Sequence, residues 1–250
     1  MKKLPIHFGV LSALTSTIIP FATANVEKTI FLGPPPVNIP TQKPTLSDLN
    51  LPSLTPGNSS IRTELDRVFP SGPPDPVAGQ ATWLLLDNLV PGQRYEVRVC
   101  WSAVWSSKEP TSFDLEVFEL NAVWGTPELI QSLAEYASTR QPPDSEPEPQ
   151  PQVHHDTSDE TGERSSSVLL LRVLAAADYF TDNAELMMNP PSVLVDLILD
   201  PFLLNVLPRS LLPTSGYIVV VAIVTWIVAR WTASYLGSIT RPRDPAKKQQ

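Results

Sequence analysis

One apolar stretch near the C-terminus, residues 216–236, constrains this 250-residue chain more than any other feature. As a helix that rises ~1.5 Å per residue it would measure roughly 31 Å, close to the hydrocarbon core of a bilayer at about 30 Å. Its one charged residue, Arg230, lies near an end, where its side chain can reach the headgroups. Alternatively, the span covers residues 211–229 and leaves Arg230 at the interface, or Arg230 is a functional charge inside the membrane. The sequence predicts one transmembrane helix.

The N-terminal residues 1–24 have the three parts of a secretory signal peptide. Two lysines precede the mostly apolar residues 4–21, which contain no acidic side chain. Ala22 and Ala24 then supply the small residues that a signal peptidase requires. We expect the mature chain to begin at Asn25, with an uncleaved anchor as the alternative.

The charges around the predicted span orient the chain in the membrane. Four basic residues follow the span, whereas Arg209 is the one basic residue close before it, so the positive-inside rule places the tail 237–250 in the cytosol. Lys247 and Lys248 stand fourth and third from the end, and this pair resembles the dilysine retrieval signal of endoplasmic reticulum (ER) membrane proteins. That resemblance implies vesicle-coat subunits as binding partners of the tail and the ER membrane as the location, with the N-terminal domain lumenal.

The composition of the segment before the span favours β structure. The chain contains 28 prolines and only 10 glycines, and proline disfavours long helices while it suits extended loops. We expect a mainly β fold: a lumenal β-sandwich-like domain formed by residues 25–140 and 165–190. A disordered, acidic and proline-rich loop, residues 141–164, separates the two parts. The net charge of -8 argues against nucleic-acid binding.

Alternating apolar side chains mark the strands of this domain. We expect strands over residues 81–86, 95–101, 112–120 and 166–174. In the second of these, Tyr95 begins the apolar face, and the opposite face carries Arg, Glu and Cys side chains. A weak helical turn is expected over residues 60–65.

Residues 89–99, Leu-Val-Pro-Gly-Gln-Arg-Tyr-Glu-Val-Arg-Val, resemble the tyrosine-corner stretch of fibronectin type III domains. The resemblance implies that Leu89 and Tyr95 pack together at the edge of a sandwich, and that the tyrosine hydroxyl bonds back to the main chain. The chain departs from that family because a further strand follows the long polar insert. A sandwich of this general kind is therefore expected, and not a member of the family.

Two single residues bear on the chemistry of a lumenal domain. Cys100 is the one cysteine, so no internal disulfide can form, and we expect a free thiol or a bond to a partner chain. Asn58 begins the Asn-Ser-Ser sequon, a candidate for N-glycosylation in a loop rich in proline and serine.

Residues 191–210 form the segment just before the span. Residues 192–207 are mostly apolar, with Asp196 and Asp200 four positions apart and Pro201 interrupting any helix. We expect an amphipathic juxtamembrane segment that lies on the membrane or packs against the sandwich or a partner. Both aspartates would form the polar face of an interfacial helix, and a catalytic acid and base is the alternative for this pair. The candidate partner contacts are Val193, Leu197, Phe202 and Leu203. A separate short helix is expected to start at Thr126-Pro127.

The chain offers little for catalysis. His154 and His155 are adjacent in the polar loop, which makes a poor metal site, and no phosphate-binding glycine motif is present. We therefore expect no catalytic, metal or cofactor site. A lumenal sandwich with one span instead suits contact with a multispan ER membrane protein.

The plan of the chain is similar to that of PIG-X-type subunits, which stabilise a mannosyltransferase of glycosylphosphatidylinositol (GPI) assembly. This resemblance implies a non-catalytic accessory subunit of a multispan ER enzyme or assembly complex. The alternative is a cargo receptor that cycles between ER and Golgi, because GOLD-domain receptors also combine a lumenal sandwich, one span and a dilysine tail. The chain lacks the paired lumenal cysteines of those receptors. A weaker third option is a lumenal factor that binds sugars or peptides.

Overall fold

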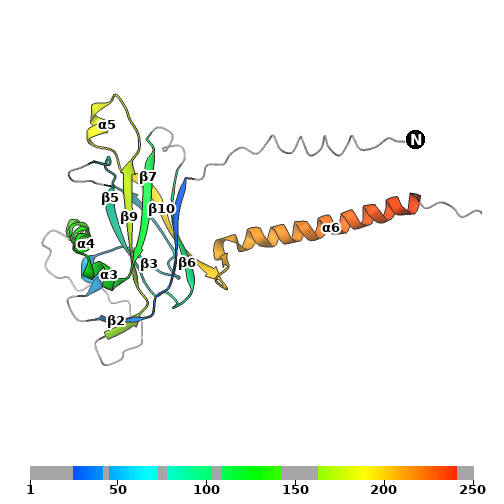
Figure 1. The fold of residues 1–250 in the computed structure, drawn as a ribbon, viewed down its shortest axis with the longest axis horizontal. Helices are drawn as coiled ribbons and strands as arrows, with labels where there is room; N and C mark the ends of the chain where they lie inside the picture. The colour runs from blue at the N-terminus through cyan, green and yellow to red at the C-terminus, as the bar shows by residue number, and fades with distance from the viewer. Residues whose placement is uncertain (1–24, 42–44, 73–77, 103–108, 142–162, 241–250) are drawn as a thin grey trace, which may run out of the picture.

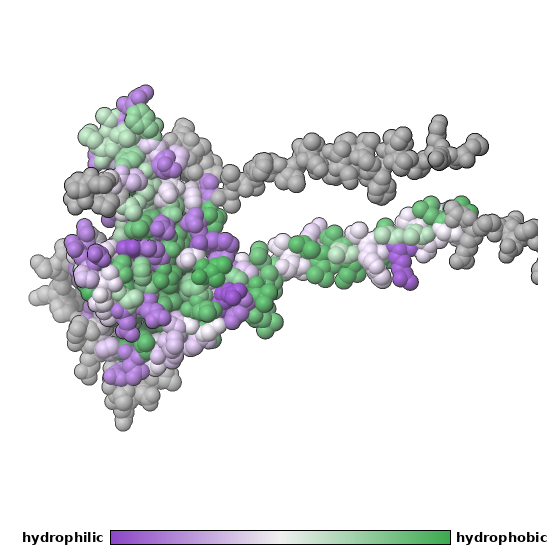
Figure 2. Space-filling model, in the orientation of Figure 1, coloured by the Kyte–Doolittle hydropathy of each residue, from purple (hydrophilic) through white to green (hydrophobic). Residues whose placement is uncertain are grey.

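A computed structural model describes residues 25–41, 45–72, 78–102, 109–141 and 163–240. These residues form a mainly β domain followed by one long helix, α6 (Leu212–Thr240), so the expected fold class is confirmed (Figure 1). The segment from Arg209 to Ile239 is long and apolar enough to cross a membrane, and its surface is largely hydrophobic (Figure 2). The expected signal peptide, residues 142–162 of the polar loop and the Lys247–Lys248 pair lie outside the described residues.

The domain consists of two main sheets and a small pair of strands. The first sheet has the order β1-β6-β10-β4, with every neighbouring pair antiparallel, and β11 pairs with the end of β10. The second sheet has the order β3-β5-β9-β7, in which only the β3–β5 pair is parallel. The strands of the first sheet are β1 (Val26–Leu32), β4 (Ser60–Leu65), β6 (Arg94–Trp101), β10 (Val193–Leu203) and β11 (Leu207–Pro208). Those of the second are β3 (Ser53–Leu54), β5 (Gln80–Leu86), β7 (Thr111–Phe118) and β9 (Leu169–Ala177), while β2 (Val37–Pro40) pairs with β8 (Glu163–Ser166).

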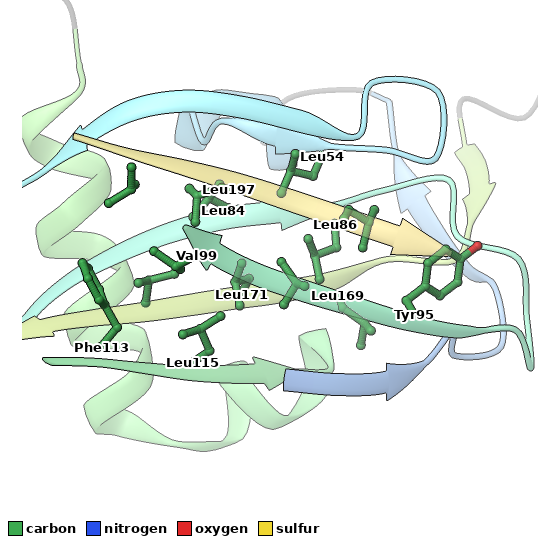
Figure 3. Packing of buried hydrophobic residues seen from close by; sticks show 14 of the residues in the cluster. Leu54, Leu84, Leu86, Tyr95, Val99, Phe113, Leu115, Leu169, Leu171 and Leu197 are labelled. Atoms are coloured by element: carbon green, nitrogen blue, oxygen red, sulfur yellow. The ribbon is translucent and has the colours of Figure 1, made fainter. Parts of the chain in front are cut away.

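The core lies between the two sheets, because alternate side chains of each strand point inward (Figure 3). The β6 alternation seen in the sequence is realised, since Tyr95, Val97 and Val99 are all fully buried. Figure 3 shows Tyr95 and Val99 beside side chains from the facing sheet, among them Leu171 of β9. Burial of these two apolar faces is the main stabilisation of the fold.

Helices cover the outer face of the second sheet, so its two central strands are buried on both faces. Helices α3 (Leu120–Gly125) and α4 (Pro127–Thr139) pack on Trp83 and Leu170, which point away from the sandwich core. The indole N–H of Trp83 donates a hydrogen bond to the Ser132 hydroxyl of α4 at 3.1 Å. This two-sided burial explains why β5 and β9 contain unbroken apolar runs. The helix expected at Thr126-Pro127 is α4.

Two segments expected to be helical are strands, and these predictions were wrong. Residues 60–65 are β4 and residues 193–203 are β10, which pair with each other antiparallel. β10 is an inner strand of the first sheet, between β6 and β4, and not a segment on the membrane surface. Pro201 is tolerated because β4 pairs only with Val193–Ile198, so the side of β10 on which Pro201 lacks an N–H has no strand to bond.

The remaining elements are short: the 3₁₀ turns η1 (Leu46–Leu49) and η2 (Arg209–Leu211), and helix α5 (Ala184–Met188). The η2 turn joins β11 to α6. Figure 1 shows the layers in order: α3 and α4, the second sheet, the first sheet, and then α6. The apolar helix thus leaves the sandwich on the side of the first sheet and runs across the direction of its strands.

Candidate functional site where the sandwich meets the apolar helix

The outer face of the first sheet is the side of the domain from which α6 leaves. Among the described residues, no helix covers this face as α3 and α4 cover the second sheet. Its side chains come from the positions of β1, β6 and β10 that alternate with the core positions, and many are charged. If α6 crosses a bilayer, this face is turned toward the membrane and toward anything bound beside the helix.

Two carboxylates lie side by side on this face. Glu96 of β6 and Asp200 of β10 are directly opposite in the register, and both are buried. Like charges at such positions destabilise a sheet unless cations accompany them. Lys28 of β1 supplies one cation, with its ammonium 3.0 Å from Glu96. Arg98 supplies the other, with guanidinium nitrogens 3.7 Å from Glu96 and 3.3 Å from Asp200.

The same charges hold the base of α6. The backbone N–H of Ser210, in η2, donates to both carboxylate oxygens of Asp200 at 3.2 and 3.3 Å. Arg98 also donates to the Ser210 hydroxyl at 3.0 Å. A carboxylate that accepts backbone N–H bonds before a helix caps its positive end and is favourably placed. The helix therefore starts from a fixed point on the sheet and not from a free linker.

The β10–β11 hairpin lies next to this attachment point. Asn205 lies in the turn of this hairpin. Its side-chain oxygen accepts a hydrogen bond from the Arg94 backbone N–H at 2.8 Å, and its side-chain nitrogen donates one to the Gly92 carbonyl at 2.9 Å. Gln93 donates to the Phe202 carbonyl at 3.2 Å. These bonds join the hairpin to the turn between β5 and β6, so both loops form one end of the sandwich.

Tyr95 lies in the core just below that end. Its hydroxyl accepts a hydrogen bond from the Val90 backbone N–H at 2.9 Å and donates to the Gln93 side chain at 3.0 Å. Leu89 is buried in the same core cluster. Burial raises the pKa of the Tyr95 hydroxyl above its ordinary value, although the bond to Val90 opposes this effect. The hydroxyl therefore stays protonated, as its donated bond requires.

The candidate partner contacts of the sequence are divided between the core and the surface. Leu197 is 0% exposed and lies in the core, so no partner can reach it while the sheet is intact. Phe202 is on the outer face, but it is buried there beneath the Arg94 guanidinium, 5.9 Å from its ring. Val193 is half-buried and packs against the core. Leu203 is 47% exposed at the hairpin, and it is the one of the four that a partner could reach freely.

Asp196, which was expected on the polar face of a helix, is paired instead with a neighbouring strand. Arg62 of β4 lies directly opposite and binds its two carboxylate oxygens at 2.7 and 2.8 Å. The hydrogen bond from Arg62 lowers the pKa of Asp196. Cys100 lies beside this pair, half-buried, and burial raises the pKa of its thiol. Asn58 is exposed in the turn between β3 and β4.

Sequence reasoning missed Lys28, Arg98 and Ser210 as parts of one site. The alternation of residues 94–101 does place Glu96 and Arg98 on the non-core face, but their partners lie on strands distant in the sequence. Within the described residues, no group of three His, Cys, Asp or Glu side chains is placed to hold a metal ion. The His154–His155 pair lies outside them.

Comparison with known proteins gives one partial match. Over 51 residues the chain is 37% identical to a subunit of GPI mannosyltransferase 2 from Schizosaccharomyces pombe. The match covers 20% of this chain and 29% of that protein, so the chain spans under a third of the length of the curated relative it matches. The chain matches no family model and no solved structure.

Proposed function

We propose that this chain is a non-catalytic accessory subunit of an ER-membrane mannosyltransferase of GPI assembly. The observation that carries the proposal is the 37% identity over 51 residues to a protein named as a GPI mannosyltransferase 2 subunit. A β domain attached to one apolar helix is the plan expected of such a subunit. The partner would be the multispan transferase, and the subunit would stabilise or position it.

The exposed surface of α6 supports this role. Within the described residues, the apolar part of this helix is not buried against the domain, so its surface is exposed and can pack with other transmembrane helices. The attachment of Ser210 to Asp200 and Arg98 keeps the base of the helix against the first sheet. A partner that binds α6 would therefore also meet the outer face of that sheet. Two exposed apolar residues of the edge strand β1, Ile30 and Leu32, lie on this face.

The test is affinity purification of the full chain from mild detergent, with quantitative mass spectrometry. We expect one multispan mannosyltransferase to co-purify with the wild type, and the complex to run far above the monomer on a blue-native gel. Replacement of residues 218–236 by an unrelated apolar helix of equal length should release the transferase. Deletion of residues 192–207 is not useful, because it would remove the inner strand β10.

Surface variants test whether the transferase also contacts the outer face of the first sheet. Ile30→Lys with Leu32→Lys changes the outer face of β1, and both side chains are exposed, so the fold should survive. Phe180→Lys is the matched control, because Phe180 is exposed in the loop after β9. We expect the β1 variant to reduce co-purification of the transferase and the control to retain it. Migration of the wild type as a monomer would refute the proposal, and co-purification of diverse secreted cargo would favour a receptor.

Retention in the ER is a separate part of the proposal. Changing Lys247 and Lys248 to serine removes the pair that resembles a retrieval signal. We expect the variant to acquire Golgi-type modification or to reach the cell surface, while the wild type stays in the ER. Unchanged residence would mean that the partner, and not the tail, holds the chain there.

A further inference from the structure

The turn of the β10–β11 hairpin contains a leucine in an unfavourable conformation. Leu204 and Asn205 have φ values of 51° and 59°, and the Val206 N–H donates to the Leu203 carbonyl at 3.0 Å, which defines a type I′ turn. Such turns favour Asn, Asp or Gly at both central positions. Every other residue with positive φ in the described part of the chain is Asn or Gly. Leu204 is the exception, and local backbone preference does not explain it.

Packing within the domain does not explain this leucine either. Leu204 is 91% exposed and Val206 is 79% exposed, so neither side chain stabilises the domain by packing. The exposed Leu211 and Leu212 continue the apolar surface into the start of α6. Figure 2 shows hydrophobic surface at the root of the helix, next to a pale band that precedes the apolar surface of α6. An apolar medium beside the root of the helix would accommodate all of these side chains.

The depth of the patch follows from the length of α6. If Arg230 lies at one interface, a hydrocarbon core about 20 helical residues thick ends near Leu211 on the side of the sandwich. Ser210, one residue before Leu211, donates a hydrogen bond to Asp200. Asp200 lies two positions before Phe202, which pairs with Pro208 in the hairpin. The turn is therefore held near the plane where acyl chains meet headgroups.

The charges beside the turn suit phospholipids. Arg94 and Arg209 flank it and are exposed, and residues 203–206 contain no acidic side chain. Basic residues next to apolar side chains are the usual composition of a segment that enters the headgroup region. A protein groove could also receive the turn, but nothing in the described residues specifies such a groove, whereas the position of the turn at the base of the span favours lipid.

We propose that residues 203–206 form a lipid-inserting loop that enters the leaflet on the sandwich side of the bilayer. With α6, it gives the domain a second point of membrane contact and fixes its orientation. The outer face of the first sheet is then held toward the headgroups. This inference requires α6 to span the bilayer and does not depend on the identity of a partner.

The test uses the full chain, without any partner, in nanodiscs of phosphatidylcholine. In a Cys100→Ser background, single cysteines at Leu204→Cys and at Phe180→Cys carry an environment-sensitive fluorophore. We expect a blue-shifted emission at position 204 and a several-fold lower quenching by iodide than at position 180, where the native Phe180 side chain is 84% exposed. Acyl chains with a shallow spin label should quench position 204 more than chains labelled near their ends.

Two further labelled positions show whether the result at position 204 comes from insertion of the loop or from misfolding of one variant. Val206→Cys should behave like position 204, whereas Ile223→Cys within α6 should be quenched most by the deep label and defines the bilayer centre. Equal iodide quenching at positions 204, 206 and 180 would overturn the proposal. That result is also the one expected if the loop binds a protein groove, because no partner is present in the nanodisc.

Discussion

Because β10 lies inside the first sheet, alanine substitutions at two leucines of this strand should have very different effects on stability. Leu197 is 0% exposed and faces the core, while Leu194 is 54% exposed on the outer face, three residues earlier. In a helix, residues three apart share a face, so Leu194→Ala and Leu197→Ala would change the free energy of unfolding by similar amounts if this segment were a surface helix. In a strand, they lie on opposite faces and must differ.

The expected magnitudes follow from burial. Full burial of a leucine side chain contributes roughly 1.5–3 kcal/mol, and the cavity left by Leu→Ala brings the total loss to about 2–5 kcal/mol. At ~2–4 °C per kcal/mol for a domain of this size, a loss of about 3 kcal/mol in Leu197→Ala lowers Tm by roughly 6–12 °C. For Leu194→Ala the free energy of unfolding should change by only about 0.5 kcal/mol, as for other surface substitutions.

The measurement is thermal or urea unfolding of the full chain in mild detergent, followed by tryptophan fluorescence. Trp83 is fully buried against α4 and reports unfolding of the domain, while α6 remains in the micelle. The two variants have the same chemistry and lie on the same strand, so each is the control for the other. Losses that agree within about 0.5 kcal/mol would refute the placement of β10 in the sheet.

Three further predictions concern single residues. Tyr95→Phe should reduce the free energy of unfolding by about 1–3 kcal/mol, since it leaves the Val90 N–H without its acceptor; an unchanged urea midpoint would argue against the bond. Because burial raises the pKa of the Cys100 thiol, its alkylation at pH 8 should be slower in the folded protein than in urea, and equal rates would mean that the thiol is exposed. Asn58 lies in an exposed turn, so a glycosidase should shift the wild type on a gel but not Asn58→Gln, and no shift in the wild type would show that the sequon is empty.

Local patterns predicted the strands that have one clear apolar face. In residues 94–101, core and surface side chains alternate, and the structure contains β6 there. The start of α4 was equally predictable, because Pro127 at its first position follows Thr126. The apolar residues of β9 on both sides of Arg172 were readable as a strand, but the packing of α3 and α4 on Leu170 was not.

β10 could not be predicted from alternation, because its apolar residues occupy both faces of the strand. Leu194 and Ile198 point outward and Val195 and Leu197 point inward, so the period of two is hidden, and Pro201 adds a further interruption. The spacing of its two aspartates fits one face of a helix and one face of a strand equally well. The candidate site depended on this choice, since a strand places Asp200 beside Glu96 and below Ser210.

The sequence by itself determined that the chain is mainly β, that residues 216–236 are apolar and long enough to span a bilayer, and where strands with one polar face lie. These features depend on the order of neighbouring residues, which the pleat of a strand and the rise of a helix convert directly into structure. Only the tertiary structure decided that β10 is a core strand and that α6 is fixed at its base. Those outcomes depend on partners such as Arg62 for Asp196, 134 residues apart, and Arg98 for Asp200, 102 residues apart. Such pairs are set by the register between strands, and no local pattern encodes that register.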